Sequence, residues 1–76
     1  MLARGSSGEN VKKLQLDLTK LGYNPGTYSG FYDMRTEEAV MLFQMEHNLA
    51  VNGVINLDTM ELIINLISKL VYNNLH

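Results

Sequence analysis

The sequence predicts an all-α fold, a compact three-helix bundle with a pseudo-twofold internal repeat and a long, apolar C-terminal helix. Apolar residues recur at helical spacing in three segments, Asp, Asn and Gly stand where those segments begin and end, and two stretches share one residue pattern. The 76 residues give room for one domain, 1–76. Because the chain has no Cys and one Pro, packing must stabilise this domain without disulfides.

Residues 9–21 form the first expected helix. Its apolar face consists of four side chains at helical spacing, Val11, Leu14, Leu18 and Leu21. Ser7 or Gly8 can cap its start, and Gly22 is well placed to end it by adopting a positive φ. Residues 23–32, YNPGTYSGFY, then combine turn signals with aromatic side chains, a pattern typical of a structured loop.

The second helix is expected over roughly residues 34–47. Asp33 is its predicted N-cap, because the carboxylate can accept from a free amide of the first turn near Thr36. Phe43 is the expected core anchor on its buried side. The following run, LAVNGVI, predicts either a tight turn or a minimal hairpin around residues 52–53.

The third helix is expected to begin after Asn56. It is apolar on more than one side, which predicts either a central position or cover by another surface. Its end, with Leu70, Val71 and Leu75, is the expected contact with another chain or domain.

An internal repeat connects these elements. Residues 11–15 and 40–44 share the order Val, apolar, Gln, while residues 30–36 and 53–59 share Gly, then Asp or Asn, then Thr. The Gln of each half is expected to hydrogen-bond loop backbone groups that would otherwise be unpaired in the core. The middle helix then serves both halves. The loop and cap residues of this framework are Gly22, Gly30, Asp33, Thr36, Gly53, Asn56 and Thr59.

These motifs follow the pattern of a known family. The matching positions are Leu2, Gly5, Gly8, Val11, Leu14, Gln15, Leu18, Leu21, Gly22, Tyr23, Gly30, Tyr32, Thr36, Ala39, Val40, Phe43, Gln44, Leu49, Gly53, Ile55, Thr59 and Leu62. In this combination the chain resembles the type-1 peptidoglycan-binding domain, a three-helix module attached to bacterial and phage cell-wall hydrolases. The resemblance covers about residues 2–63 and leaves a C-terminal helical extension, 64–76. Asp33 and Asn56 stand where the family has a second Gly, and both residue types tolerate positive φ.

Composition excludes several other classes of function. The net charge is −2 and the six Lys and Arg are scattered, so no nucleic-acid partner is expected. No apolar run reaches the length of a membrane span, and the N-terminal residues lack the apolar region of a signal peptide. His47 and His76 lie far apart in the sequence, and Cys is absent. We therefore expect no catalytic residues, no metal site and no cofactor.

The aromatic loop is the candidate ligand surface. Sugars are often held by an aromatic face beside hydrogen-bonding groups. The candidate ligand-binding residues are Tyr23, Asn24, Tyr28, Ser29, Phe31, Tyr32 and Arg35. Arg35 is the candidate contact for a stem-peptide carboxylate. The alternative is packing, because Tyr32 aligns with Ile55 of the other half and Tyr23 would lie over the end of the first helix.

The resemblance implies non-catalytic binding of bacterial peptidoglycan, through its glycan, its stem peptide or both. Such binding would target an attached amidase, peptidase or glycosidase to its substrate. The expected location is extracellular or in the cell wall, as part of a longer exported or phage-encoded protein. The alternative is a protein-interaction module that docks on its catalytic domain, or forms a homodimer, through the apolar C-terminal helix.

Overall fold

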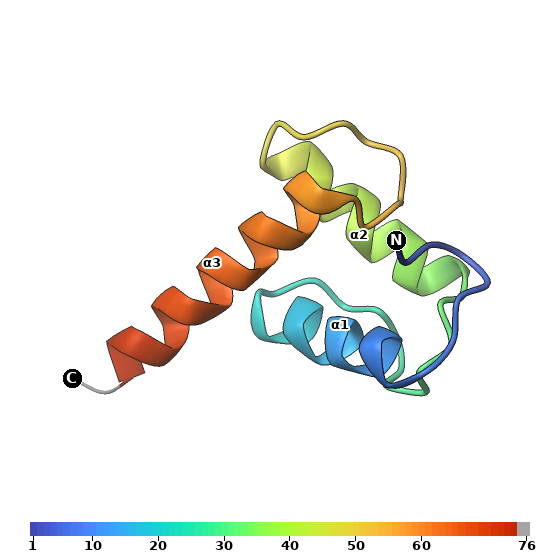
Figure 1. Ribbon diagram of the computed structural model, residues 1–76, viewed down its shortest axis with the longest axis horizontal. Helices are drawn as coiled ribbons and strands as arrows, with labels where there is room; N and C mark the ends of the chain where they lie inside the picture. Colours follow the sequence, from blue (N-terminus) through green and yellow to red (C-terminus); the bar gives the residue numbers. More distant parts are fainter. Residues whose placement is uncertain (75–76) are drawn as a thin grey trace.

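The computed structural model describes residues 1–74, so Leu75 and His76, at the end of the predicted extension, lie outside the described residues. Three helices follow one another along the chain (Figure 1), α1 (Glu9–Lys20), α2 (Met34–Glu46) and α3 (Leu57–Asn74). All three begin where the sequence predicts, and the first two end one residue earlier than expected. The prediction of an all-α, three-helix fold is confirmed.

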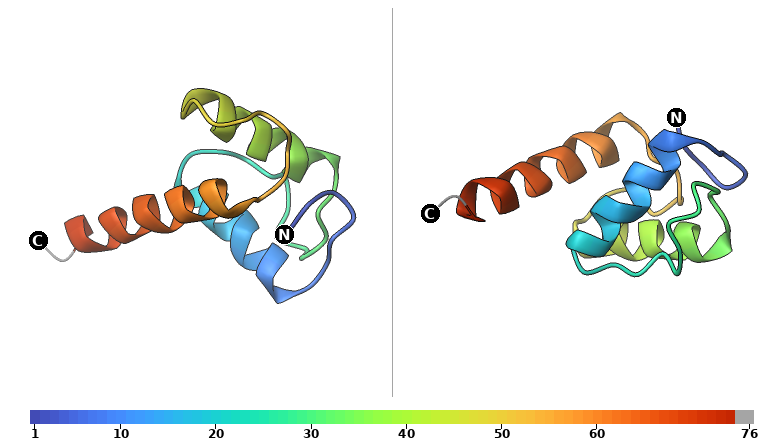
Figure 2. Two further views of the ribbon diagram at one scale, coloured as in Figure 1. Left: turned by 45° about the horizontal axis from the view of Figure 1, so that its top comes forward. Right: turned by 90° about the horizontal axis from the view of Figure 1, so that it is seen from below.

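The core lies where α1 packs against both of the other helices (Figure 2). Its buried apolar side chains come from all three helices and from the loops before α2 and α3. They are Val11, Leu14, Leu18, Tyr23, Tyr32, Ala39, Val40, Phe43, Ile55 and Ile63. Phe43 is completely buried, as its predicted role as a core anchor requires. Two loop residues, Tyr32 and Ile55, thus belong to the core together with the helices.

The first two helices end in the same way. After α1, Gly22 has φ 95°, and the N–H of Tyr23 donates to Leu18 O at 2.8 Å. After α2, Asn48 takes the left-handed conformation, with φ 59°, and the N–H of Leu49 closes the equivalent bond back into the helix at 2.9 Å. Both endings are Schellman motifs, in which a residue of positive φ lets late carbonyls of the helix find donors.

The N-terminal segment crosses the loops of both halves. Leu2 and Ile55 form an isolated antiparallel bridge, in which the Ile55 N–H donates to Leu2 O at 2.8 Å. Ser7 and Phe31 form a second antiparallel bridge. The hairpin considered for residues 52–53 is not formed, because Ile55 pairs with the N-terminal segment and not back across the turn.

The C-terminal half of α3 projects beyond α1 and α2 (Figures 1 and 2), and the longest dimension of the molecule is 38 Å. Ile63 is 4% exposed, whereas Val71, two turns further along, is 56% exposed. This half of the helix therefore has solvent on most of its sides. Within residues 1–74, no helix has the length and apolar character needed to cross a membrane.

Candidate functional site

In the first half of the repeat, Gln15 connects α1 to the loop before α2. Its Oε1 accepts from the Gly30 N–H at 2.9 Å. Its Nε2 donates to Phe31 O at 2.9 Å and to Thr36 Oγ1 at 3.0 Å. Because Gln15 is completely buried, these bonds pair loop groups that would otherwise have no partner in the core.

In the second half, Gln44 does the same for the loop before α3. Its Oε1 accepts from the N–H groups of Asn52 and Gly53, at 3.0 and 2.9 Å. Its Nε2 donates to Val54 O at 2.9 Å and to Thr59 Oγ1 at 3.2 Å. The two glutamines therefore have the role expected from the sequence, and the internal repeat is visible in their hydrogen bonds.

The entries into α2 and α3 are also equivalent. Asp33 Oδ1 accepts from the Thr36 N–H at 2.9 Å, and Asn56 Oδ1 accepts from the Thr59 N–H at 3.0 Å. The backbone hydrogen bond from Thr36 holds the pKa of Asp33 below its ordinary value, because that bond favours the charged carboxylate. Both side chains act as N-caps, and the pattern of Gly, Asp or Asn, and Thr is thus a requirement of the fold.

Two of the seven candidate ligand residues prove to be internal. Tyr32 is completely buried and its hydroxyl donates to Gly53 O at 2.5 Å, so it connects the two halves and has no surface to offer a ligand. Burial raises the pKa of Tyr32, with the negative charge of Glu37 as a smaller cause. The assignment of Tyr32 as a ligand contact is therefore corrected to a core role, because its side chain is completely buried and its hydroxyl is bonded within the protein.

Tyr23 is internal as well. Its ring packs edge-on against Phe43, with 5.4 Å between centroids, and its hydroxyl donates to Glu46 Oε1 at 2.6 Å. Desolvation and then the bond to Glu46 raise the pKa of Tyr23 to about 12. Tyr23 is thus a packing residue, as the packing alternative had it, and the side chains that its ring and hydroxyl contact, Phe43 and Glu46, belong to α2.

Five of the seven candidate residues reach solvent, and we call three of them, Tyr28, Phe31 and Arg35, the aromatic-loop surface. Tyr28 is 47% exposed and Phe31 is 51% exposed, while Arg35 lies on the first turn of α2. A Cβ atom on Gly26 would be only 2.9 Å from Arg35 Nε, so the arginine side chain lies directly over that glycine. Neither ion pair found among residues 1–74 involves Arg35.

The remaining two candidates stabilise the loop beneath this surface. Asn24 Oδ1 accepts from the Gly26 N–H at 2.8 Å, and Ser29 Oγ accepts from the Phe31 N–H at 3.1 Å. Each side chain thereby closes a small turn of its own backbone. Asn24 and Ser29 are exposed, but their hydrogen bonds give them a structural task in setting the loop geometry.

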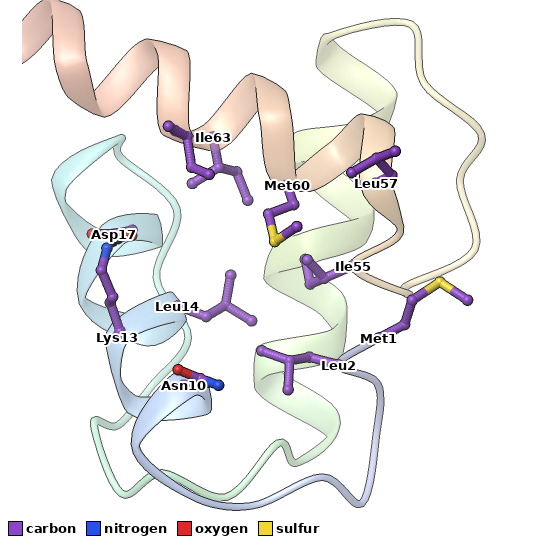
Figure 3. Close-up of a pocket in the computed structure, with 11 residues that line it drawn as sticks. Met1, Leu2, Asn10, Lys13, Leu14, Asp17, Ile55, Leu57, Met60 and Ile63 are labelled. Carbon is purple, nitrogen blue, oxygen red and sulfur yellow. Dashed lines mark hydrogen bonds and ion pairs between the residues drawn. The ribbon is translucent and has the colours of Figure 1, made fainter.

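A groove that the sequence did not predict lies between α1 and the first half of α3 (Figure 3). Its volume is about 540 Å³ and most of its lining is apolar. The lining residues are Met1, Leu2, Asn10, Lys13, Leu14, Asp17, Ile55, Leu57, Met60, Ile63 and Ile64. None of the seven candidate ligand residues is among them. The available sequence signal was the second apolar side of the third helix, where Leu57, Met60 and Ile64 recur at spacings of three and four.

Among residues 1–74, no three His, Cys, Asp or Glu side chains are grouped so that they would hold a metal ion. His47, at the end of α2, stacks on Phe43 with 4.2 Å between ring centroids, and its Nδ1 lies 2.8 Å from Phe43 O. This places His47 in a structural contact at the helix terminus. The geometry described so far is that of three helices connected by two glutamine-centred, hydrogen-bonded loops.

Comparison with solved structures supports the same description. The crystal structure of the SleB N-terminal domain superposes with a TM-score of 0.82 and 31% identity, covering 86% of this chain and 89% of that one. A peptidoglycan-binding protein from Clostridioides difficile, solved in complex with glutamine hydroxamate, has a TM-score of 0.78 and 34% identity. That match covers 82% of this chain and 39% of the other.

Sequence relatives are much longer proteins. A "Probable CtpA-like serine protease" of Staphylococcus haemolyticus is 39% identical over 57 residues, which are 75% of this chain and 12% of the relative. The N-acetylmuramoyl-L-alanine amidase CwlM of Mycobacterium tuberculosis is 34% identical over 53 residues, 70% of this chain and 13% of the amidase. This chain therefore spans only a small part of the curated relatives that it matches.

The family assignment rests on a match to most of the chain. Residues 7–63 match the model of the family described as "Putative peptidoglycan binding domain". This range contains both glutamine-centred loops, both N-caps and the core residues of α1 and α2. The family resemblance inferred from the sequence is confirmed, and this chain belongs to the peptidoglycan-binding domain family, homologous to modules attached to cell-wall hydrolases.

Proposed function

We propose that this domain binds peptidoglycan without cleaving it and that it holds an attached cell-wall hydrolase on the polymer. The observation that carries the proposal is the family match over residues 7–63. The relatives support it, because an amidase and a protease-like protein each contain a similar segment within a much longer sequence. A module of this kind raises the concentration of an attached enzyme at its substrate even where each contact is weak.

Peptidoglycan-binding modules of cell-wall hydrolases act in the cell wall or the extracellular space. We place this domain there, as part of a longer exported or phage-encoded protein. A second candidate role is docking to an attached catalytic domain or to another copy through α3. That role is favoured by the exposure of apolar side chains on its second half, among them Val71 and Leu70.

We assign wall contact to the aromatic-loop surface. The exposed rings of Tyr28 and Phe31 offer apolar faces on which sugar rings pack. The guanidinium of Arg35 offers forked donors that suit a stem-peptide carboxylate. Because Arg35 already lies over Gly26, its side chain loses little further conformational freedom on binding. The hydrogen bonds of Asn24 and Ser29 fix the loop that carries these groups.

Sedimentation with purified cell-wall sacculi tests the function. The isolated chain is expected to sediment with the walls and to release no soluble fragments. Tyr28→Ala and Phe31→Ala should each weaken binding by about five- to tenfold, the effect of removing one interface anchor worth about 1 kcal/mol or more. The matched control is Met45→Ala, since Met45 on α2 is 58% exposed and lies outside the surface. Fragment release, or no binding to walls of several bacterial types, would refute the proposal.

Walls stripped of stem peptides by an amidase separate the two kinds of contact. Arg35→Gln should weaken binding to intact walls by about tenfold, because a charge-assisted bond to a carboxylate is lost. The same variant should bind stripped walls as well as the unaltered chain does. An equal loss on both materials would show that Arg35 does not contact the stem peptide, while leaving wall binding itself established.

A further inference from the structure

The sequence contains one Asn-Gly dipeptide, Asn52–Gly53, and it lies in the loop before α3. Asparagine is thermolabile in proteins, because the backbone nitrogen of the following residue can attack its side-chain amide. A following Gly makes this attack easiest, since it has no side chain to hinder the nitrogen and adopts most backbone conformations. Every other Asn in the sequence precedes a residue with a side chain. Asn52 is therefore the position at which this chemistry is favoured.

The reaction converts the side-chain amide to a carboxylate, with water as the second reactant. Hydroxide removes the proton of the Gly53 N–H, and the nitrogen forms a bond to Asn52 Cγ. The Cγ–Nδ2 bond then breaks, and Nδ2 takes a proton from water and leaves as ammonia, so that a cyclic succinimide remains. Water opens this ring at either of its carbonyl carbons. The product is an aspartate at position 52, or an isoaspartate whose main chain runs through the side-chain carboxyl carbon.

The folded loop holds both reacting groups. Gly53 is buried, and its N–H donates to Gln44 Oε1 at 2.9 Å. Asn52 Oδ1 accepts from the Val54 N–H at 3.0 Å and from Gln44 Nε2 at 3.1 Å. Hydroxide does not reach an amide proton that is buried and bonded to an amide oxygen, so the attacking nitrogen does not form while these bonds last. Because Asn52 itself is exposed, the protection comes from the Gly53 N–H.

We propose that Asn52 is a deamidation site that Gln44 keeps closed in the folded protein and that reacts when the loop before α3 opens. Local opening is fast compared with this chemistry, so the rate follows the population of the open loop. In the first half of the repeat Gln15 holds the Gly30 N–H in the same way, but Ser29 precedes that glycine. Because serine carries no amide, the equivalent loop has no such site.

The two products differ in their effect on the loop. Within residues 1–74 the Asn52 side chain accepts through Oδ1 in both of its hydrogen bonds, and an aspartate offers the same oxygen. Isoaspartate instead adds a carbon atom to the main chain between positions 52 and 53. This displaces Gly53, whose N–H is bonded to Gln44 and whose oxygen accepts from the Tyr32 hydroxyl at 2.5 Å. A loop that reacts through isoaspartate therefore does not close again, and its opening becomes irreversible.

The proposal does not depend on wall binding, because the reaction is measured on the free chain. Peptide mass spectrometry follows the change from amide to acid during incubation at one pH, in buffer and in concentrated guanidinium chloride. The folded chain is expected to react at Asn52 more than about 100-fold more slowly than the unfolded chain. Rates within about threefold of each other would overturn the proposal. Asn52→Gln is the control for the site, since its side chain would have to form a larger ring, and this peptide should then lose the change.

Gln44→Leu tests whether the glutamine itself controls the reaction. The matched control is Gln15→Leu, which removes the equivalent side chain of the first half and leaves the bonds to Gly53 in place. The two variants are compared at denaturant concentrations that unfold the same small fraction of each. Gln44→Leu should then react more than about tenfold faster than Gln15→Leu, because its loop opens without unfolding of the whole domain. Equal rates would show that global unfolding controls the reaction, and would overturn the role of Gln44.

Hydrogen exchange covers the case in which Gln44→Leu does not fold. Exchange of the Gly53 amide and deamidation of Asn52 both require hydroxide to remove the same proton. In the unaltered chain the two reactions should therefore be slowed by the same factor, to within about threefold, and both rates should rise in proportion to hydroxide concentration. A Gly53 amide that exchanges as fast in the folded chain as in the unfolded chain would overturn the proposal.

The products themselves test the effect on the loop. Asn52→Asp, which carries the ordinary product, should unfold at nearly the same denaturant concentration as the unaltered chain. Chains that contain isoaspartate, separated by ion-exchange chromatography, should unfold at a clearly lower concentration. Equal midpoints for the two products would overturn the assigned irreversibility, because the loop would then close around the longer main chain.

Discussion

In the first half of the repeat Gln15 holds a loop around Gly30, and in the second half Gln44 holds a loop around Gly53 in the same way. The side chains outside this frame differ. The residue after the glycine is Phe31 in one loop and Val54 in the other, and Phe31 is much more exposed. The equivalent hydrogen bonds thus build one scaffold twice, while the first loop alone carries exposed aromatic rings, those of Tyr28 and Phe31.

This difference separates residues that the fold needs from residues that are free to recognise a ligand. Arg35 of the first half corresponds to Asp58 of the second, two residues after each N-cap, so the repeat does not fix the charge at this position. We expect ligand contacts at positions where the two halves differ in sequence. The positions that they share are already explained by the hydrogen bonds that the fold requires. The following predictions test how far the equivalence of the halves extends.

The largest effects are expected from the two glutamines. Gln44→Leu leaves buried loop groups, including the Gly53 N–H, without partners, and each such group costs about 1–3 kcal/mol. We expect a loss of about 3 kcal/mol or more in the free energy of unfolding. Gln15→Leu should cost about 2 kcal/mol, because that side chain serves fewer groups. Urea denaturation measures both, with the exposed Glu38→Leu as control. Losses below about 1 kcal/mol would contradict the assigned role.

The two loop glycines should respond unequally to substitution. Both have positive φ, 83° at Gly30 and 73° at Gly53, so Ala is strained at either position. At Gly30 the new Cβ would also lie 3.1 Å from the backbone oxygen of Gly8, which cannot swing away. At Gly53 it would meet the flexible side chain of Glu37 at 2.8 Å.

We therefore expect Gly30→Ala to cost about 2–3 kcal/mol and Gly53→Ala about 1–2 kcal/mol in the free energy of unfolding. Thermal and urea unfolding of the two variants under identical conditions give the comparison. A larger loss for Gly53→Ala than for Gly30→Ala would contradict this prediction. It would mean that the backbone of the loop before α2 can shift to accommodate the new Cβ atom.

The smallest expected effect concerns the two N-caps, Asp33 and Asn56, which should differ in how the stability of the protein depends on pH. The pKa of Asp33 is lowered in the folded state, so its contribution is present above the ordinary pKa of 3.8 and is lost as the pH falls through the folded value. Asn56 does not titrate. Asp33→Asn should therefore flatten the stability profile below about pH 4, by about 0.5–1 kcal/mol. Asn56→Asp should steepen it by a similar amount. Unfolding curves measured from pH 2 to 7 test this prediction. If the unaltered chain, Asp33→Asn and Asn56→Asp show the same dependence of stability on pH, a carboxylate at the N-cap makes no pH-dependent contribution.

Local chemistry explains why so much of the fold could be predicted. Asp33 at the start of α2 and Gly22 after the end of α1 act within one helical turn, so the sequence alone places these boundaries to within a residue. The repeat then assigned Gln15 and Gln44 to their loops, because the same spacing appears twice. These inferences needed no knowledge of which distant segments touch.

Features that depend on distant contacts were harder to predict. The bridge between Leu2 and Ile55 joins residues far apart in the sequence, and the local turn signal, which allowed either a tight turn or a minimal hairpin, gave no indication of it. Tyr32 and Tyr28 are the same residue type in one loop, yet one is buried and the other is 47% exposed. Only the path of the loop over α1 decides between them. The groove beside α3 likewise depends on how two helices are set against each other.

The N-terminal segment that crosses both loops also has a consequence for the folding kinetics. Loop closure between Leu2 and Ile55 spans most of the chain, so this pairing carries a large entropic cost and is expected to form late. Ser7 and Phe31 can pair sooner, because fewer residues separate them. The two halves share α2, and the N-terminal segment forms a β-bridge to the loop of each half. They should therefore unfold in a single cooperative transition and not one after the other.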